Sequence, residues 1–154
     1  MPCLLPLNPF KLPVHLEPLY PVHFLPAADI IDRLHTGEIE TLDFLGCNEK
    51  WSGDIITNPP YKYAIDFIKR SLELINDGNK VAMFLKLQFL EGKKRKELFA
   101  KTPPKFLLVS SSRILCAKNA EFEYMRRSGG SAVAYGWYIW EKGFKGVPQI
   151  KWIN

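Results

Sequence analysis

Two short apolar segments that flank one helical segment constrain the fold of this chain most strongly. The first segment, Gly53 to Asn58, has the sequence GDIITN, and its β-branched residues favour a strand. The second segment, Lys80 to Leu87, has the sequence KVAMFLKL and is nearly all apolar, as is typical of a strand buried on both faces. Between them, apolar residues recur at the helical period from about Tyr63 to Asn76. Short apolar strands that alternate with helices in this way predict a mostly parallel sheet.

The remaining segments continue this alternation. We expect strands within 28–33, 40–47, 105–111 and 131–142, and a short basic helix over 92–101 that the following TPP ends. The sequence therefore predicts an α/β fold with a mostly parallel, Rossmann-like sheet and helices on both faces. Sheets of this type bind ligands beyond the carboxyl ends of their strands, and Asn58 lies at one such end.

The N-terminal segment has a different character. Seven of the twelve prolines fall within the first 26 residues. Proline fixes φ and removes a backbone donor, so neither a helix nor a central strand tolerates this density. We therefore expect residues 1–27 to form an extended or disordered arm, and residues 28–154 to form the domain.

Composition limits the classes of function. No apolar run approaches the roughly 18 residues of a membrane helix, and no signal-peptide pattern is present, so no membrane partner is expected. The three cysteines form no C-x-x-C pair and the three histidines have no ligand spacing, which predicts free thiols in a reducing, cytoplasmic compartment and no metal site. The net charge of +5 favours an anionic partner such as nucleic acid and simple solubility about equally.

The tetrapeptide Asn58-Pro59-Pro60-Tyr61 follows the first apolar segment directly. Each proline holds the residue before it in an extended conformation, and prolines donate no hydrogen bond. The carbonyls of Asn58 and Pro59 and the Asn58 side chain would then converge as acceptors beside the Tyr61 ring, which suits an exocyclic amino group on a planar base. The alternative is a plain strand-to-helix turn, with Asn58 as the helix cap and Pro60 in the first turn. The full tetrapeptide favours the chemical interpretation.

The segment DIITNPPY resembles the catalytic motif of amino-group methyltransferases that methylate the exocyclic amino group of adenine in DNA. The segments DFLG, NPPYKYA, KVAMFLKL and AVAYGWYIWEKG follow in the same order as in bacterial and phage adenine-specific DNA methyltransferases. The resemblance covers roughly residues 28–154. It implies a Rossmann-like methyltransferase sheet, S-adenosylmethionine as the methyl donor, and double-stranded DNA with a flipped adenine as the substrate. It also implies a setting such as restriction–modification in the cytoplasm of a bacterial host or a phage-infected cell.

The resemblance also implies roles for single residues. Asn58 and the Pro59 carbonyl would hold the target amino group, with Pro60 completing the rigid motif, and Tyr61 would stack on the flipped base. For the cofactor, Asp29 would hold the ribose hydroxyls, Asp43 and Phe44 would contact the adenine, and Asn58 would lie beside the methyl donor. Basic and polar residues of the helix at 92–101 and the long loop at 111–131 would contact DNA, the alternative being solvated surface. The predicted DNA contacts are Lys62, Lys93, Arg95, Arg113, Lys118, Asn119, Arg126 and Arg127.

The sequence departs from the family in one respect. Methyltransferases of this type carry a glycine-rich loop after their first strand, upstream of the acid matched here by Asp29, yet the first glycine of this chain is Gly37. We therefore expect a sheet that is incomplete at its N-terminus. Two hypotheses stay open at this stage: an active enzyme, or a non-catalytic or truncated DNA-binding remnant or subunit. In the second case, a missing N-terminal half or a partner chain would complete the fold.

Overall fold

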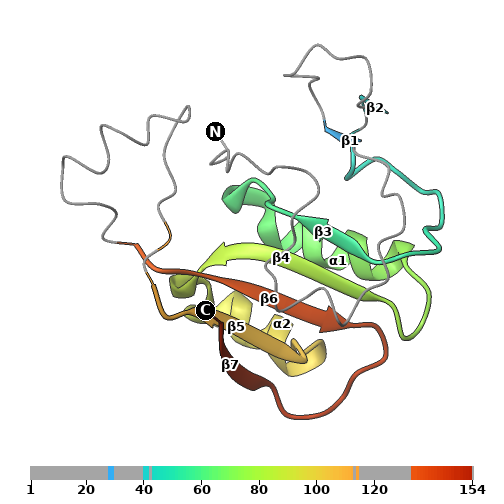
Figure 1. The fold of residues 1–154 in the computed structure, drawn as a ribbon. Helices are drawn as coiled ribbons and strands as arrows, with labels where there is room; N and C mark the ends of the chain where they lie inside the picture. Colours follow the sequence, from blue (N-terminus) through green and yellow to red (C-terminus); the bar gives the residue numbers. More distant parts are fainter. Residues whose placement is uncertain (1–27, 30–39, 42, 113, 115–132, 154) are drawn as a thin grey trace, which may run out of the picture.

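The computed structural model describes residues 28–29, 40–41, 43–112, 114 and 133–153. The predicted proline-rich arm, residues 1–27, lies outside this range. Figure 1 shows a five-stranded sheet in the order β3-β4-β6-β5-β7 and a separate parallel pair of two-residue strands, β1 and β2. The strands are β1 Ala28–Asp29, β2 Glu40–Thr41, β3 Ile55–Thr57, β4 Lys80–Lys86, β5 Phe106–Ser110, β6 Tyr135–Glu141 and β7 Gln149–Ile153. The helices are the 3-10 turns η2 Tyr61–Tyr63 and η3 Leu87–Leu90 and the α-helices α1 Ala64–Leu74 and α2 Lys93–Lys101.

The main sheet is mixed, with one reversed strand near its centre. β3 pairs with β4 in parallel and β5 pairs with β7 in parallel, whereas β6 is antiparallel to both β4 and β5. Four of the five strands therefore point the same way. The α/β fold class with a mostly parallel sheet is confirmed, including the strand-helix-strand unit β3-α1-β4.

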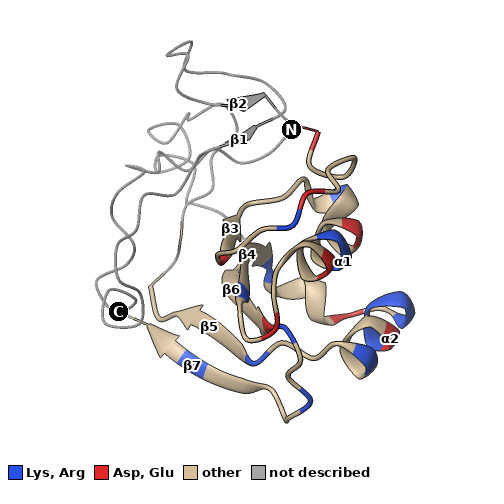
Figure 2. Ribbon diagram, turned by 90° about the vertical axis from the view of Figure 1, so that its right-hand side faces the viewer, with Lys and Arg blue, Asp and Glu red and all other residues tan. Residues whose placement is uncertain are grey.

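Strand β4 supplies apolar side chains to both faces of the sheet, as its continuous apolar sequence predicts. Val81, Met83 and Leu85 belong to the larger buried cluster, together with residues of α1 and α2. Ala82 and Phe84 belong to clusters on the other face. Figure 2 shows that the two described α-helices cover the same face of the sheet. The expected helical cover is thus present on one face within the described part of the chain.

The aromatic strand β6 lies in the core rather than at the surface. Tyr138 and Trp140 are 0% and 1% exposed, and their rings stack with centroids 5.9 Å apart. Trp137 is half-buried on the other face, where its ring is tilted against Phe84. The strand expected within 131–142 is therefore present, and its burial makes it a packing element of the core.

Two expectations for secondary structure differ from the structure. The strand expected over 40–47 is present only at Glu40–Thr41, because the chain from Asp43 to Cys47 forms a turn in which Gly46 and Cys47 donate to the Asp43 carbonyl. Strand β7 was not expected, because its alternating, mostly exposed residues lack the apolar run that marks a buried strand. None of the helices in the described segments is long and apolar enough to cross a bilayer.

Candidate active site at the carboxyl end of β3

The Asn58 motif lies where β3 stops and β4 continues. The last residue of β3, Thr57, pairs with Met83, and β4 extends to Lys86, so three residues of β4 project beyond the end of β3. Strand β6 begins at the same height, because Tyr135 pairs with Lys86. The motif therefore lies beside a short wall formed by the ends of β4 and β6. This is the carboxyl edge at which parallel sheets bind ligands.

Asn58 does not cap the helix that follows it. Pro60 is the N-cap of η2 and Tyr63 is the N-cap of α1, and neither cap makes a side-chain hydrogen bond. The side-chain oxygen of Asn58 is instead buried. A plain strand-to-helix turn would use the Asn58 side chain as a cap. The structure therefore does not support the capping role that the sequence left open for Asn58.

The prolines fix which backbone acceptors remain available. Pro60 has φ −57° and ψ 117°, and its carbonyl accepts the Tyr63 N–H at 2.8 Å, which closes the 3-10 turn. Pro59 is fully buried, and no donor among the described residues reaches its carbonyl oxygen. The Pro59 carbonyl is thus a candidate acceptor for a ligand, as the sequence predicts, whereas the Pro60 carbonyl is already used.

Tyr61 is held as a neutral, half-buried ring. Its ring centroid lies 6.2 Å from that of Tyr135, and the Lys86 ammonium lies 5.4 Å from the Tyr61 centroid. Tyr135 in turn stacks on Phe84 with centroids 5.3 Å apart. Burial first, and then the nearby Tyr135 hydroxyl, raise the pKa of Tyr61 well above its usual value. The Tyr61 hydroxyl is buried and forms no well-aligned hydrogen bond with a described residue, so what this side chain offers is its ring.

Lys86 and Tyr135 are neighbours of the site that the sequence analysis missed as site residues. They become adjacent to Tyr61 only because β6 is antiparallel to β4 and begins opposite Lys86. No local spacing carries that information, since the two residues lie far apart in the chain. Strand order would have been needed to find them.

The residues predicted to hold the cofactor lie on two other segments. Asp29 is in β1, where the structure describes the backbone alone. Asp43 is exposed and accepts the Leu45 N–H at 3.2 Å, while the Phe44 ring stacks on Phe67 of α1 at 5.1 Å. The Asp43–Cys47 turn is thus anchored on α1, the helix that follows the Asn58 motif. A carboxylate can accept hydrogen bonds from a nucleoside and an aromatic ring can stack on its base, so Asp43 and Phe44 have the chemistry expected of nucleoside-binding residues.

The predicted DNA contacts divide into three groups. Lys62 and Lys93 are exposed, and they lie in the segments that follow the carboxyl ends of β3 and β4. Arg95 is engaged within the protein: its guanidinium donates to the carbonyls of Gln88 and Glu91 at 2.9 Å each and lies over the Phe89 ring. Arg95 thus links η3 to α2 through these hydrogen bonds. A contact between Arg95 and DNA stays a prediction. The remaining predicted contacts lie outside the described residues: Arg113, Lys118, Asn119, Arg126 and Arg127.

Comparison with known proteins yields structural likeness without sequence relatives. No protein-family model and no curated protein match the chain. The structure is similar to that of a predicted O-methyltransferase, protein Atu636 from Agrobacterium tumefaciens, with a TM-score of 0.51 and 14% identity over 75% of this chain. The chain spans about half of that protein, 53% of its length.

Weaker likenesses are found to two structures of M1.HpyAVI. The first has a TM-score of 0.34 and 17% identity, and it covers 72% of this chain and 60% of M1.HpyAVI. The second, the M1.HpyAVI-SAM complex, has a TM-score of 0.35 and 16% identity, and it covers 73% of this chain and 60% of the other. Together with the strand order, the first likeness shows that the chain has a Rossmann-like α/β fold.

Proposed function

We propose that this protein transfers a methyl group from S-adenosylmethionine to the exocyclic amino group of adenine in double-stranded DNA. The observation that carries the proposal is the placement of the Asn58 motif. It lies at the carboxyl end of β3, its asparagine caps no helix, and the Pro59 carbonyl accepts no hydrogen bond from the described chain. A rigid segment with these properties and an adjacent Tyr61 ring supports recognition of an amino group on a planar base.

The motif would act on the amino nitrogen by positioning. In free adenine, the nitrogen lone pair is delocalised into the ring and is a poor nucleophile. The Asn58 side-chain oxygen and the Pro59 carbonyl would each accept one amino hydrogen, which holds the nitrogen in place and favours a pyramidal geometry with the lone pair directed outward. When bound, S-adenosylmethionine supplies an electrophilic methyl group on a sulfonium. Such preorganised acceptors contribute through orientation and electrostatics and need no side chain with an unusual basicity.

The Tyr61 ring would support the base itself. A neutral aromatic ring stacks on any purine, and a base–aromatic contact contributes about 1–3 kcal/mol in nucleic-acid complexes. The contacts of Tyr61 with Tyr135 and Lys86 limit the movement of its ring. Little conformational entropy of this side chain is therefore lost when the base binds. Asp29, Asp43 and Phe44 are the proposed cofactor-binding residues alongside Asn58, and Lys62 and Lys93 are the proposed phosphate contacts at this edge.

The proposal is tested by transfer of a labelled methyl group to DNA. Asn58→Ala should lower the rate by about 100-fold or more, the loss typical when a preorganised hydrogen-bonding group is removed from a reacting centre. Asn76→Ala is the matched control, because Asn76 is exposed in the turn after α1, at the amino end of β4. Equal activity of wild type and Asn58→Ala would contradict the assigned role of the motif.

Calorimetric titration with S-adenosylmethionine distinguishes an active methyltransferase from a non-catalytic DNA-binding subunit or remnant. The enzyme should bind the cofactor, and Asp29→Ala should weaken that binding. A folded wild-type chain that binds DNA but neither binds S-adenosylmethionine nor transfers methyl groups would instead be a DNA-binding subunit or remnant. Because the chain spans about half of the similar methyltransferase, this outcome would direct the search to a partner polypeptide.

A further inference from the structure

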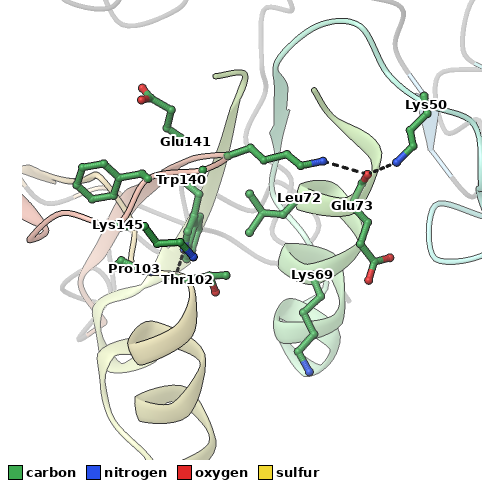
Figure 3. Close-up of a pocket in the computed structure, with 12 residues that line it drawn as sticks. Lys50, Lys69, Leu72, Glu73, Thr102, Pro103, Trp140, Glu141 and Lys145 are labelled. Carbon is green, nitrogen blue, oxygen red and sulfur yellow. Dashed lines mark hydrogen bonds between the residues drawn. The ribbon is translucent and has the colours of Figure 1, made fainter. Parts of the chain in front are cut away.

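A cavity lies beside the amino end of β4, on the side of the sheet opposite Asn58. Its volume is about 550 Å³, within the usual range for small-molecule sites. Glu141, which lines it, pairs with Lys80, the first residue of β4, whereas Asn58 follows the last residue of β3. Figure 3 shows the cavity between the end of α1, the segment after α2, and the connection from β6 towards β7. The cavity is therefore separate from the proposed active site.

The acidic residues of this cavity are already neutralised. Glu141 forms an ion pair with Lys105 at 2.7 Å, and Glu73 forms one with Arg70 at 3.1 Å. Both basic partners lie outside the lining. The two carboxylates are therefore balanced without using any lysine of the cavity.

Four lysines of the lining keep an uncompensated charge. The Lys50 ammonium donates to the Glu73 carbonyl at 2.8 Å, and the Lys142 ammonium donates to the Ile75 carbonyl at 2.6 Å. These neutral acceptors at the end of α1 offset only part of the charge, because a helix C-terminus carries about half a negative charge. Lys69 and Lys145 have neither an ion pair nor a hydrogen bond within the described residues. Four ammonium groups around one cavity repel one another and favour an anion.

The walls between these lysines are apolar. Leu72, Pro103 and Phe144 line the cavity and are partly exposed, with the buried Trp140 behind them, so part of a ligand would be removed from water. The cations are all lysines, which bind phosphate as mobile point charges, and four of them together favour a multiply charged group such as a phosphate over a single carboxylate. The lining thus favours a ligand with a phosphate group and an apolar or planar part.

We propose that this cavity binds a small phosphorylated molecule whose planar or apolar part rests on the partly exposed side chains of Leu72, Pro103 and Phe144 while its phosphates face Lys69 and Lys145. A nucleotide has this chemistry, and its size suits the cavity volume. The proposal does not depend on methyl transfer. A nucleic-acid strand is the other polyphosphate that four lysines could attract, and the test separates the two.

The test is calorimetric titration of the full chain with ATP, tripolyphosphate and uncharged adenosine. ATP should bind in a saturable way, tripolyphosphate more weakly, and adenosine most weakly. The double variant Lys69→Gln/Lys145→Gln should weaken ATP binding roughly tenfold, the combined effect of two modest charge contacts. Lys50 and Lys142 are left in place because they hold the end of α1.

Two further variants make the result specific. Lys94→Gln/Lys96→Gln removes the same charge from exposed positions of α2 outside the lining and should bind ATP like the wild type. Asn58→Ala should also bind ATP like the wild type, because the proposed active site is at the carboxyl ends of β3 and β4 and the cavity is at the opposite strand ends. The single variants Lys69→Gln and Lys145→Gln should each show a smaller loss, and they carry the test if the double variant does not fold.

Several outcomes would overturn the proposal. These are no saturable binding of ATP, equal weakening in the α2 control, loss of ATP binding in Asn58→Ala, or a lysine-dependent site that takes DNA and excludes ATP. A loss of methylation with intact ATP binding would concern the active site alone. Failure of one proposal is therefore distinguishable from failure of the other.

Discussion

Tyr61 shows how one side chain can serve packing and a site together. Its ring contacts Tyr135 and Lys86, while its hydroxyl is buried without a well-aligned hydrogen bond in the described structure. A buried hydroxyl that lacks a good partner costs free energy relative to a ring without it. The ring is therefore the part of Tyr61 that we expect to matter.

Tyr61→Phe should keep the free energy of unfolding within about 1 kcal/mol of wild type, or raise it, because only the buried hydroxyl is lost. It should also keep most of the methyl transfer. Tyr61→Ala should lower transfer roughly ten- to a hundredfold through the lost stacking contact. Urea unfolding and the DNA methylation assay give both quantities. A Phe variant as inactive as the Ala variant would show that the hydroxyl takes part in the reaction.

Tyr61 also predicts how stability changes in alkaline solution. Burial raises the pKa of Tyr61 and of Tyr138 in the folded protein, while in the unfolded chain both ionise near the usual tyrosine pKa of about 10. Above that pH, the unfolded state releases protons that the folded state retains, so the free energy of unfolding falls as pH rises. Tyr61→Phe should remove at most about 1.4 kcal/mol of the stability that the wild type loses between pH 9 and about pH 11. Urea midpoints of both proteins between pH 9 and about pH 11 check this, and parallel curves would contradict it.

At the scale of single residues, the sequence predicts the motif but not its surroundings. The two prolines after Asn58 restrict the backbone by local sterics, which a sequence shows directly. Lys86 and Tyr135 join Tyr61 through the pairing of two strands, which depends on tertiary structure. The hydrogen bonds of Arg95 to the Gln88 and Glu91 carbonyls likewise depend on the turn that η3 forms, and local sequence does not show them.

At the scale of elements, α1 carries an isolated polar group in its buried face. Ser71 is fully buried, and no described residue hydrogen-bonds its hydroxyl. Alanine has the higher helix propensity and removes this hydroxyl. We therefore expect Ser71→Ala to raise the free energy of unfolding by about 1 kcal/mol in urea titration. Ala100→Ser, at an exposed site of α2, measures the propensity difference alone. A less stable Ser71→Ala protein would show that the hydroxyl is used.

Strand β6 contains a glycine that the sheet requires. A Cβ atom at Gly136 would lie 2.8 Å from the Leu108 carbonyl oxygen of β5 and 3.1 Å from a Leu87 methyl group. Gly136→Ala should therefore force the two strands apart and lower the free energy of unfolding by about 2 kcal/mol. Gly46→Ala is the control, because its Cβ would meet only ordinary contacts at an exposed turn. Equal stability of the two variants would contradict the close approach of β5 and β6.

The sequence is a better guide to these elements where they are buried than where they are exposed. The predicted helices over 63–76 and 92–101 match α1 and α2 closely, because apolar periodicity and the TPP stop are local signals. Strand β7 escaped prediction because it lies at the edge of the sheet. There Ile150 and Trp152 are 55% and 71% exposed, so burial does not select an apolar run.

At the scale of the whole molecule, basic side chains lie both near the carboxyl ends of the strands and on the opposite side of the sheet. Lys62 and Lys93 follow the carboxyl ends of β3 and β4, whereas Lys101 lies at the end of α2, which returns to the opposite edge. Of these three lysines, a DNA partner at the carboxyl ends of the strands should therefore depend on Lys62 and Lys93 and not on Lys101.

Lys62→Gln and Lys93→Gln should each flatten the plot of log binding constant against log salt concentration by about 0.9, the change expected for one lost phosphate contact. Lys101→Gln should leave the slope unchanged. Fluorescence anisotropy with a labelled duplex at several salt concentrations provides the slopes. An equal change in all three variants would indicate attraction by net charge alone, without a defined DNA face.

The position of β6 has a consequence for biosynthesis. Lys80 pairs with Glu141 and Lys86 with Tyr135, so β4 acquires its second neighbour only after most of the chain has left the ribosome. β4 and β5 are not neighbours of each other, and β6 alone connects them. Until it emerges, both strands present unpaired edges beside apolar side chains, a state prone to misassociation. Pairings between such distant segments also fold slowly. Nascent chains of this protein are therefore expected to benefit from chaperones that shield a half-built sheet.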